Sequence, residues 1–187
     1  MIKFRCRHLF LIGLLILGLF RGVAIPDTSR EYPIKAAFLY NFAKFVEWPA
    51  ESFKNESTPI HLYILGVDPF GPALDPLKDQ IVRSRKIMCK RIVRLDEAED
   101  CEILYISASE KNQLPAILGA LKKRDILTVS DLDRFAAQGG MIGLVTVDNK
   151  IQFEINLEAV RQTRLKISSQ LLKLARIIPH GAREMKE

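Results

Sequence analysis

The sequence contains little of the chemistry on which enzymes and metal sites depend. Its 187 residues include only three histidines and three cysteines, and neither type is clustered. No HExxH, CxxC or comparable metal-ligand spacing occurs, and no GxSxG elbow, Walker loop or GxGxxG motif is present. These absences argue against a structural zinc site, a phosphate-binding loop and a common type of hydrolase. We therefore expect a protein that is not an enzyme, with no catalytic residues, metal or cofactor.

Long hydrophobic runs are also scarce, and the one that occurs lies at the N-terminus. A basic stretch with Lys3, Arg5 and Arg7 precedes a twelve-residue apolar segment at 9–20, and small residues follow near Ala24. This order is typical of a secretory signal peptide. Twelve helical residues span about 18 Å, which is short of the roughly 30 Å hydrocarbon core of a bilayer. We predict a signal peptide over residues 1–24, cleaved on export to the periplasm, with an uncleaved anchor as the alternative.

An excess of one charge is missing from the rest of the chain. The formal net charge is +6, but four cations and no acid lie in residues 1–24, so the remaining residues carry only +2. The isoelectric point of 9.3 is therefore no indication of nucleic-acid binding. The aromatic stacking pattern of single-strand binders is also missing. We expect no nucleic-acid partner.

Apolar segments with strand and helix periodicity alternate over the remaining residues, 25–187. Strands are predicted over residues 59–66, 86–93, 102–107, 126–129, 141–147 and 150–155, and helices over 31–48, 112–124, 131–138 and 168–178. The last two strands flank Asp148-Asn149, a hairpin turn, and Asn156 and Ser168 are predicted helix caps. No linker or repeat divides the chain. We predict a single α/β domain whose mixed, mostly parallel sheet has five or six strands with helices packed on it.

A basic segment over residues 83–94 contains six cations and no acid. On a strand, Lys86, Lys90 and Arg94 share one face. One interpretation is an edge strand that lysine protects against pairing with another chain. The other is a site for a small anionic ligand, a lipid headgroup or an acidic partner surface. Both interpretations stay open on the sequence.

Cys89 and Cys101 are the only cysteines after the signal peptide. An even count in an oxidising compartment favours a disulfide, which would stabilise the fold by about 3 kcal/mol in the chain-entropy model. The predicted strands do not bring the two thiols together clearly, however. Two buried free thiols are the alternative.

Several ordered segments resemble the YfiR family of exported proteins. They are IKAAFLYNFAKFVEWP at 34–49, LGVDPFG at 65–71, CEILYIS at 101–107, LTVSD at 127–131, GMI at 140–142, FEIN at 153–156 and SSQLLKLA at 168–175. Each segment alone is unspecific, but the ordered set spans residues 32–178. The resemblance implies a periplasmic α/β domain, often dimeric, that binds an inner-membrane signalling protein.

The best-known member of that family represses a membrane diguanylate cyclase by binding its periplasmic domain. Its release raises cyclic di-GMP and promotes biofilm formation. Other relatives resemble accessory or sensory modules, so the alternative is a sensor of a small anionic ligand beside a membrane receptor or sensor kinase. The type member also uses disulfides as a redox signal. Here no cysteine lies in the strand at 59–66 or after Cys101, so the resemblance does not extend to that signal.

Phe45 and Trp48, at the end of the first predicted helix, are the candidate anchors for a partner interface. Large aromatic side chains are enriched in the centres of such interfaces. The alternative for both residues is packing in the core.

Overall fold

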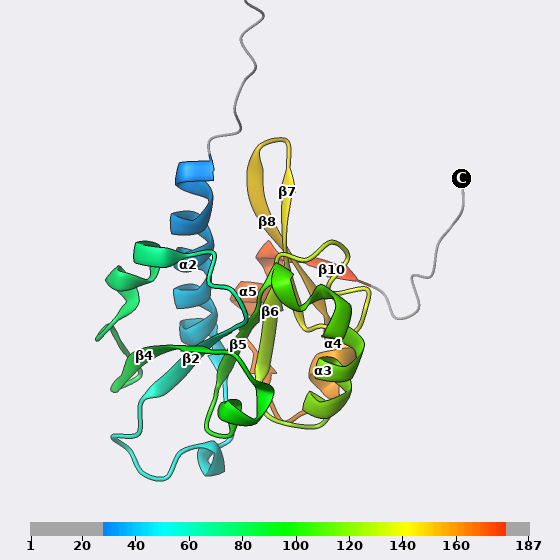
Figure 1. Ribbon diagram of the computed structural model, residues 1–187. Coiled ribbons are helices and arrows are strands. Elements are labelled where there is room, and N and C mark those ends of the chain that lie inside the picture. Colours follow the sequence, from blue (N-terminus) through cyan, green and yellow to red (C-terminus); the bar gives the residue numbers. More distant parts are fainter. Residues whose placement is uncertain (1–27, 179–187) are drawn as a thin grey trace, which may run out of the picture.

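An eight-stranded mixed sheet organises the computed structural model, which describes residues 28–178 (Figure 1). The strand order is β10-β8-β7-β6-β5-β2-β4-β3. The strands are β2 Ile60–Leu65, β3 Ile81–Val82, β4 Arg85–Ile92, β5 Ile103–Ile106, β6 Leu127–Ser130, β7 Ile142–Val147, β8 Lys150–Asn156 and β10 Arg176–Ile178. From β4 to β7 all neighbours are parallel, and β7 and β8 form the predicted antiparallel hairpin. The α/β class and the mostly parallel sheet are confirmed, and the predicted signal peptide lies outside the described residues.

The sheet is larger than predicted because a short strand is added at each edge. The predicted helix at 168–178 ends early: α5 spans Ser169–Leu174, and Arg176–Ile178 then pairs with β8 as β10. The β-branched pair Ile177-Ile178 suits a strand, and the open edge of β8 supplies its hydrogen-bond partners. At the other edge β3 turns back onto β4 through Arg83 and Ser84, which have φ values of 49° and 67°.

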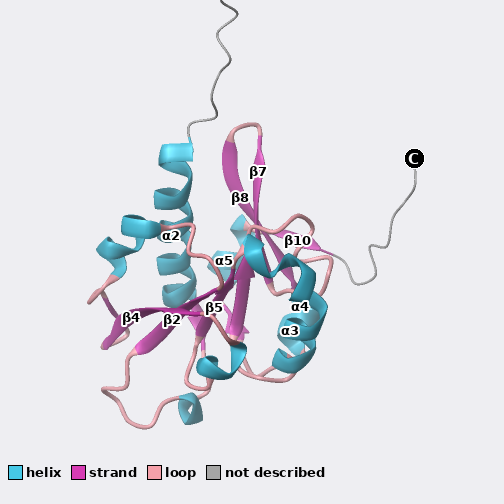
Figure 2. Cartoon of the chain, viewed as in Figure 1, coloured by secondary structure: helices cyan, strands magenta, loops and turns pink. Residues whose placement is uncertain are grey.

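One face of the sheet is covered by α2, Thr28–Phe45, together with α5 and a 3₁₀ helix over Gly71–Leu77 (Figure 2). The buried side of α2 includes Leu39, Phe42 and Ala43. This helix ends three residues before the predicted end at Trp48, because Val46–Glu47 forms a two-residue strand, β1, with β9 at Lys166–Ile167. α2 therefore spans one face of the sheet and is fixed at its C-terminal end by β9.

The opposite face is covered chiefly by α3, Leu114–Leu121, which belongs to one apolar cluster with side chains of β2 and β5. The remaining helices are α4 at Leu157–Arg161 and the 3₁₀ helices Ala50–Ser52, Leu95–Ala98 and Ala108–Gln113. Both predicted caps are confirmed: Asn156 accepts from the Ala159 N–H and Ser168 from the Leu171 N–H. The predicted helix at 131–138 is wrong, since this segment forms consecutive turns. Arg134 has a φ of 53°, which a right-handed helix does not accommodate.

Candidate functional site

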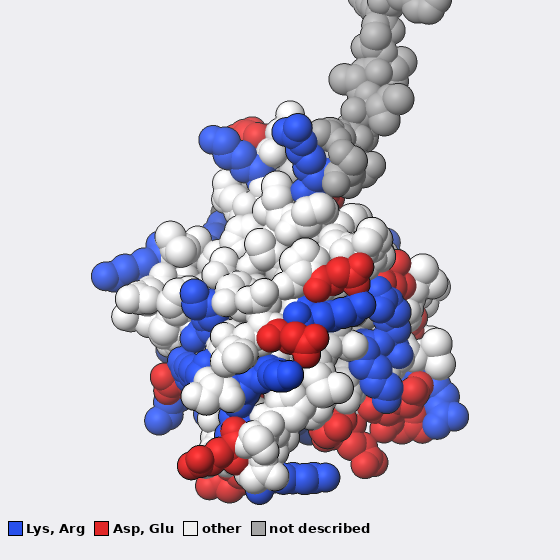
Figure 3. Space-filling view, turned by 90° about the vertical axis from the view of Figure 1, so that its left-hand side faces the viewer, with Lys and Arg blue, Asp and Glu red and all other residues white. Residues whose placement is uncertain are grey.

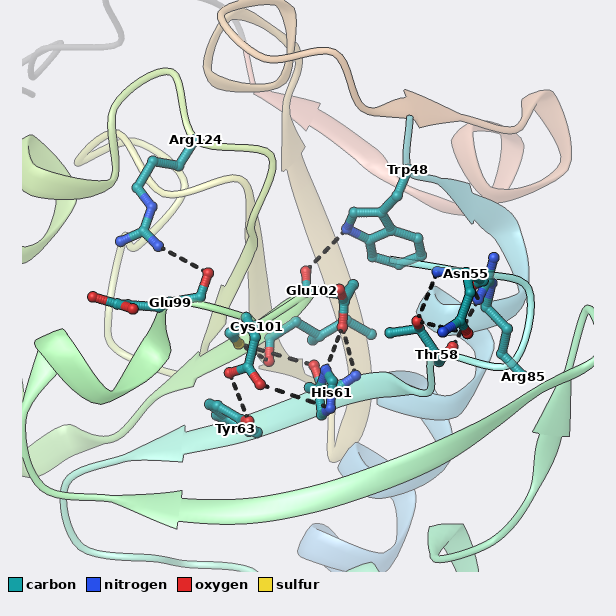
Figure 4. A network of polar contacts seen from close by, with 12 residues as sticks. Trp48, Asn55, Thr58, His61, Tyr63, Arg85, Glu99, Cys101, Glu102 and Arg124 are labelled. Atoms are coloured by element: carbon teal, nitrogen blue, oxygen red, sulfur yellow. Dashed lines mark hydrogen bonds and ion pairs between the residues drawn. The ribbon is translucent and has the colours of Figure 1, made fainter. Parts of the chain in front are cut away.

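The two predicted interface anchors lie at the C-terminal end of α2: Phe45 is its last residue, and Trp48 directly follows β1. Phe45 and Trp48 are both half-buried and pack against the core cluster under α2. The indole Nε1 of Trp48 donates a hydrogen bond to the carbonyl of Glu102 at 3.1 Å (Figure 4). Part of each ring is therefore occupied by the protein's own core, and only the remainder can meet a partner. Their role as partner anchors stays a prediction.

The predicted basic cluster does not form one face. Lys86 and Lys90 lie on the same side of β4, but β4 ends at Ile92 and Arg94 lies beyond it. Arg94 instead makes two hydrogen bonds to Asp96, at 3.0 and 2.6 Å. The Lys86 ammonium lies 3.8 Å from Asp79, and that of Lys90 lies 5.3 Å from the ring centroid of Tyr63. The anion site predicted from these three residues is thus reduced to two lysines.

The two cysteines are free thiols on opposite faces of the sheet. Cys89 on β4 packs against the core under α2, whereas Cys101 belongs to the cluster under α3. β2 lies between β4 and β5, so their chains are about 9 to 10 Å apart, beyond the span of a disulfide. Burial raises the pKa of both thiols. The predicted Cys89–Cys101 disulfide is therefore wrong, and the alternative of two free thiols is what the structure contains.

A buried histidine–carboxylate pair lies near the N-terminal ends of β2 and β5 (Figure 4). Glu102 is 3% exposed, and its Oε2 accepts the backbone N–H of His61 at 2.7 Å and lies 3.1 Å from the imidazole Nδ1. The other ring nitrogen is 3.9 Å from Asp100, which accepts a hydrogen bond from Tyr63 at 2.9 Å. The hydrogen bond with Glu102 raises the pKa of His61 although burial opposes it. The sequence offers only a weak signal for this pair, a glutamate within an apolar strand segment.

This pair predicts a pH-dependent stability. Because the folded-state pKa of His61 is raised above 6.5, the folded protein binds this proton more tightly than the unfolded chain. The stabilisation is complete below 6.5 and is lost as the pH rises through the folded pKa. We expect urea denaturation to show a free energy of unfolding that falls as the pH rises above 6.5, and a flatter profile for His61→Asn. Equal slopes for the two proteins would show that another group causes the dependence.

A second buried polar cluster joins α2 to the C-terminal end of β6. The Lys35 side chain is nearly fully buried, and its ammonium lies 2.5 Å from carboxylate oxygens of both Glu31 and Asp131. Tyr32 also donates a hydrogen bond to Asp131 at 3.3 Å. Burial alone would lower the pKa of Lys35, but the hydrogen bonds to Asp131 and Glu31 outweigh it and the pKa is raised. The lysine therefore stays charged and fixes the helix on the sheet.

Potential metal ligands do not converge in the part of the chain that the structure describes. Within residues 28–178 no three His, Cys, Asp or Glu side chains are placed to hold a metal ion. None of the helices in this range is both long and apolar enough to cross a membrane. On the side of the molecule where β4 lies, basic and acidic side chains are interspersed around an uncharged area (Figure 3).

The mostly parallel sheet with helices on both faces defines an α/β protein. In a comparison with known families, the family described as YfiR/HmsC-like matches residues 32–176. The match extends from the first turns of α2 to the first residue of β10, nearly the whole described body. The chain belongs to the YfiR/HmsC-like family, whose members are periplasmic regulators. The resemblance seen in the ordered sequence segments is thereby confirmed.

Proposed function

We propose that this protein is an exported regulator that binds the periplasmic part of an inner-membrane diguanylate cyclase and represses it. The observation that carries the proposal is the family match over residues 32–176. Repression follows if the protein binds the inactive state of the enzyme more tightly than the active state, because binding then shifts the population toward the inactive state. Release of the regulator would raise cyclic di-GMP and favour biofilm growth. We expect the protein to act as a homodimer, as the family resemblance implies.

Exposed apolar side chains at one end of the sheet support a role in protein binding. Val67 follows β2 and is 73% exposed, and Val93 follows β4 and is 79% exposed. The two strands are parallel, and the Gly66 N–H bonds to the Ile92 carbonyl at 3.0 Å, so the two valines lie at the same end of the sheet. Met88, on β4, is 53% exposed. Neighbouring exposed apolar groups are typical of interaction surfaces, so the two valines are candidates for contact with the partner.

Recovery of the membrane partner tests this function. Tagged protein expressed in the periplasm of its own host is purified from solubilised inner membranes, and the bound proteins are identified by mass spectrometry. We expect a membrane protein with a diguanylate cyclase domain as the dominant species. A sensor kinase in its place would reassign the pathway, and the recovery of no membrane signalling protein would contradict the proposal.

The alternative function, sensing of a small anionic ligand, now depends on Lys86 and Lys90. A thermal-shift series with phosphate and citrate tests it, with Lys90→Glu as the variant and Lys122→Glu as the control on an exposed position elsewhere. A rise in Tm that Lys90→Glu abolishes and Lys122→Glu retains would favour the sensor. If the protein is the proposed regulator, we expect no such rise, because Lys86 lies beside Asp79 and Lys90 lies over the Tyr63 ring.

A further inference from the structure

We propose that the outer edge of β4 binds an extended, acidic segment of the partner protein as an added strand. The proposal deepens the regulator function above and rests on it. Edge strands recognise extended segments in this way when their backbone groups are free and nothing covers them. Three features of β4 support the proposal. Most of its outer edge has no paired strand, backbone groups are directed outward there, and its side chains form a pattern that specifies the segment.

The outer edge has no paired strand over more than half of β4. β3 pairs only with Arg85 and Lys86, and the connecting chain adds two hydrogen bonds between Ile87 and residues 79–80. Beyond Ile87 no strand within residues 28–178 lies on the outer side of β4. The inner side, by contrast, pairs with β2 in regular register as far as Ile92. The register with β2 thus runs without a bulge along this part of β4.

The alternation of a parallel ladder shows which backbone groups face outward. The Ile87 N–H bonds to Gln80 on the outer side at 2.8 Å, and the Ile92 carbonyl bonds to Gly66 of the inner side at 3.0 Å. Residues two apart along a strand direct their N–H and C=O groups to the same side. Cys89 and Arg91 consequently present their N–H and C=O groups outward, which is the spacing that one added strand needs.

The side chains on the open face specify the segment. Lys86, Met88 and Lys90 alternate on the face of β4 that α3 leaves exposed. Lys90 makes no ion pair in the described part of the chain. The one ion pair of Lys86 is with Asp79 at 3.8 Å, and the side chains of Lys86 and Asp79 are both well exposed. Such a surface pair contributes at most about 1 kcal/mol and is easily exchanged. Ile81 already lies opposite Lys86, so an added strand with an apolar and an acidic residue two positions apart would place these side chains beside Met88 and Lys90. A second acidic residue in the segment would meet the Lys86 charge only at longer range.

Amide exchange tests the geometry with the peptide Thr-Glu-Thr-Leu-Thr-Glu-Thr as the probe. In the free protein the amides of Cys89 and Arg91 should exchange fast, while those of Met88 and Lys90, which face β2, should be protected. At millimolar peptide, exchange at Cys89 and Arg91 should slow by about tenfold or more, with no change at Met88 and Lys90. No added protection at Cys89 and Arg91 would overturn the proposal and leave lysine protection of the edge as the role of these residues.

Charge reversal tests the specificity and separates this proposal from the function on which it rests. Lys86→Glu/Lys90→Glu should weaken peptide binding and membrane-partner capture by about tenfold or more, while the control Lys122→Glu/Lys173→Glu binds as the wild type does. Both pairs are exposed, so folding is not at stake. If the wild type captures a signalling partner and Lys86→Glu/Lys90→Glu captures it equally, the edge proposal fails and the function stands. If the wild type captures none, the function itself fails.

Discussion

Replacing Lys35 with methionine should lower the free energy of unfolding by about 3 to 5 kcal/mol. The lysine is 3% exposed and neutralises Asp131, which is itself mostly buried. Removing the cation leaves a carboxylate at the end of β6 without its partner, and the cost of an unpaired buried charge exceeds the value of the pair. The loss is measured by urea denaturation at pH 7.

Two further variants distinguish this cause from a general loss of packing. Lys35→Met/Asp131→Asn removes both charges and should recover most of the lost stability, because Glu31, which also loses its partner, is partly exposed to solvent. Lys44→Met, at an exposed position of the same helix, should change the stability by less than about 0.5 kcal/mol. If Lys35→Met were as stable as the wild type, α2 would not depend on this ion pair.

Replacing Phe42 with alanine should cost about 3 to 5 kcal/mol. Phe42 is a fully buried residue of α2. The centroid of its ring lies 5.4 Å from that of Phe153 on β8 and 6.1 Å from that of Phe38. The deletion removes the Phe42–Phe153 ring contact between α2 and the hairpin, leaves that of Phe38 with Phe153, and creates a cavity in a close-packed region. The midpoint of urea unfolding should fall accordingly, with the native circular dichroism spectrum retained.

Phe53→Ala is the matched control for this deletion. Phe53 is half-buried at the surface, where the Arg85 guanidinium covers it at 3.8 Å. Its loss should cost about 1 kcal/mol, since most of the exposed space refills with water. A loss at Phe42 no larger than the loss at Phe53 would contradict the assignment of Phe42 to the centre of the core.

The regular elements are predictable from local periodicity because their signals lie within the segments themselves. The central strands, the hairpin around Asp148-Asn149 and the caps at Asn156 and Ser168 are all found. The edge strands β3 and β10 are not predicted, since two or three residues become a strand only when a neighbouring edge provides their hydrogen-bond partners. The fold class is thus recoverable from the sequence, whereas the limits of the sheet are not.

The polar clusters depend on contacts between distant segments and are invisible to periodicity. Lys35 and Asp131 are 96 residues apart, and His61 and Glu102 are 41 apart. A pattern analysis therefore assigns Lys35 to the solvent side of α2, while the structure buries it and leaves Ile34 46% exposed. The predicted disulfide is wrong for a related reason. It is the strand order that places β2 between β4 and β5, and local periodicity does not reveal strand order.

Cyclic di-GMP in the native host tests the central claim most directly. Deleting the gene should raise the cyclic di-GMP content and biofilm mass of the cells, and the full chain supplied from a plasmid should restore both. The same chain without residues 2–24 should not restore them, because the proposed repression takes place in the periplasm. An unchanged cyclic di-GMP content after deletion, or full restoration by the chain without its export segment, would contradict the account.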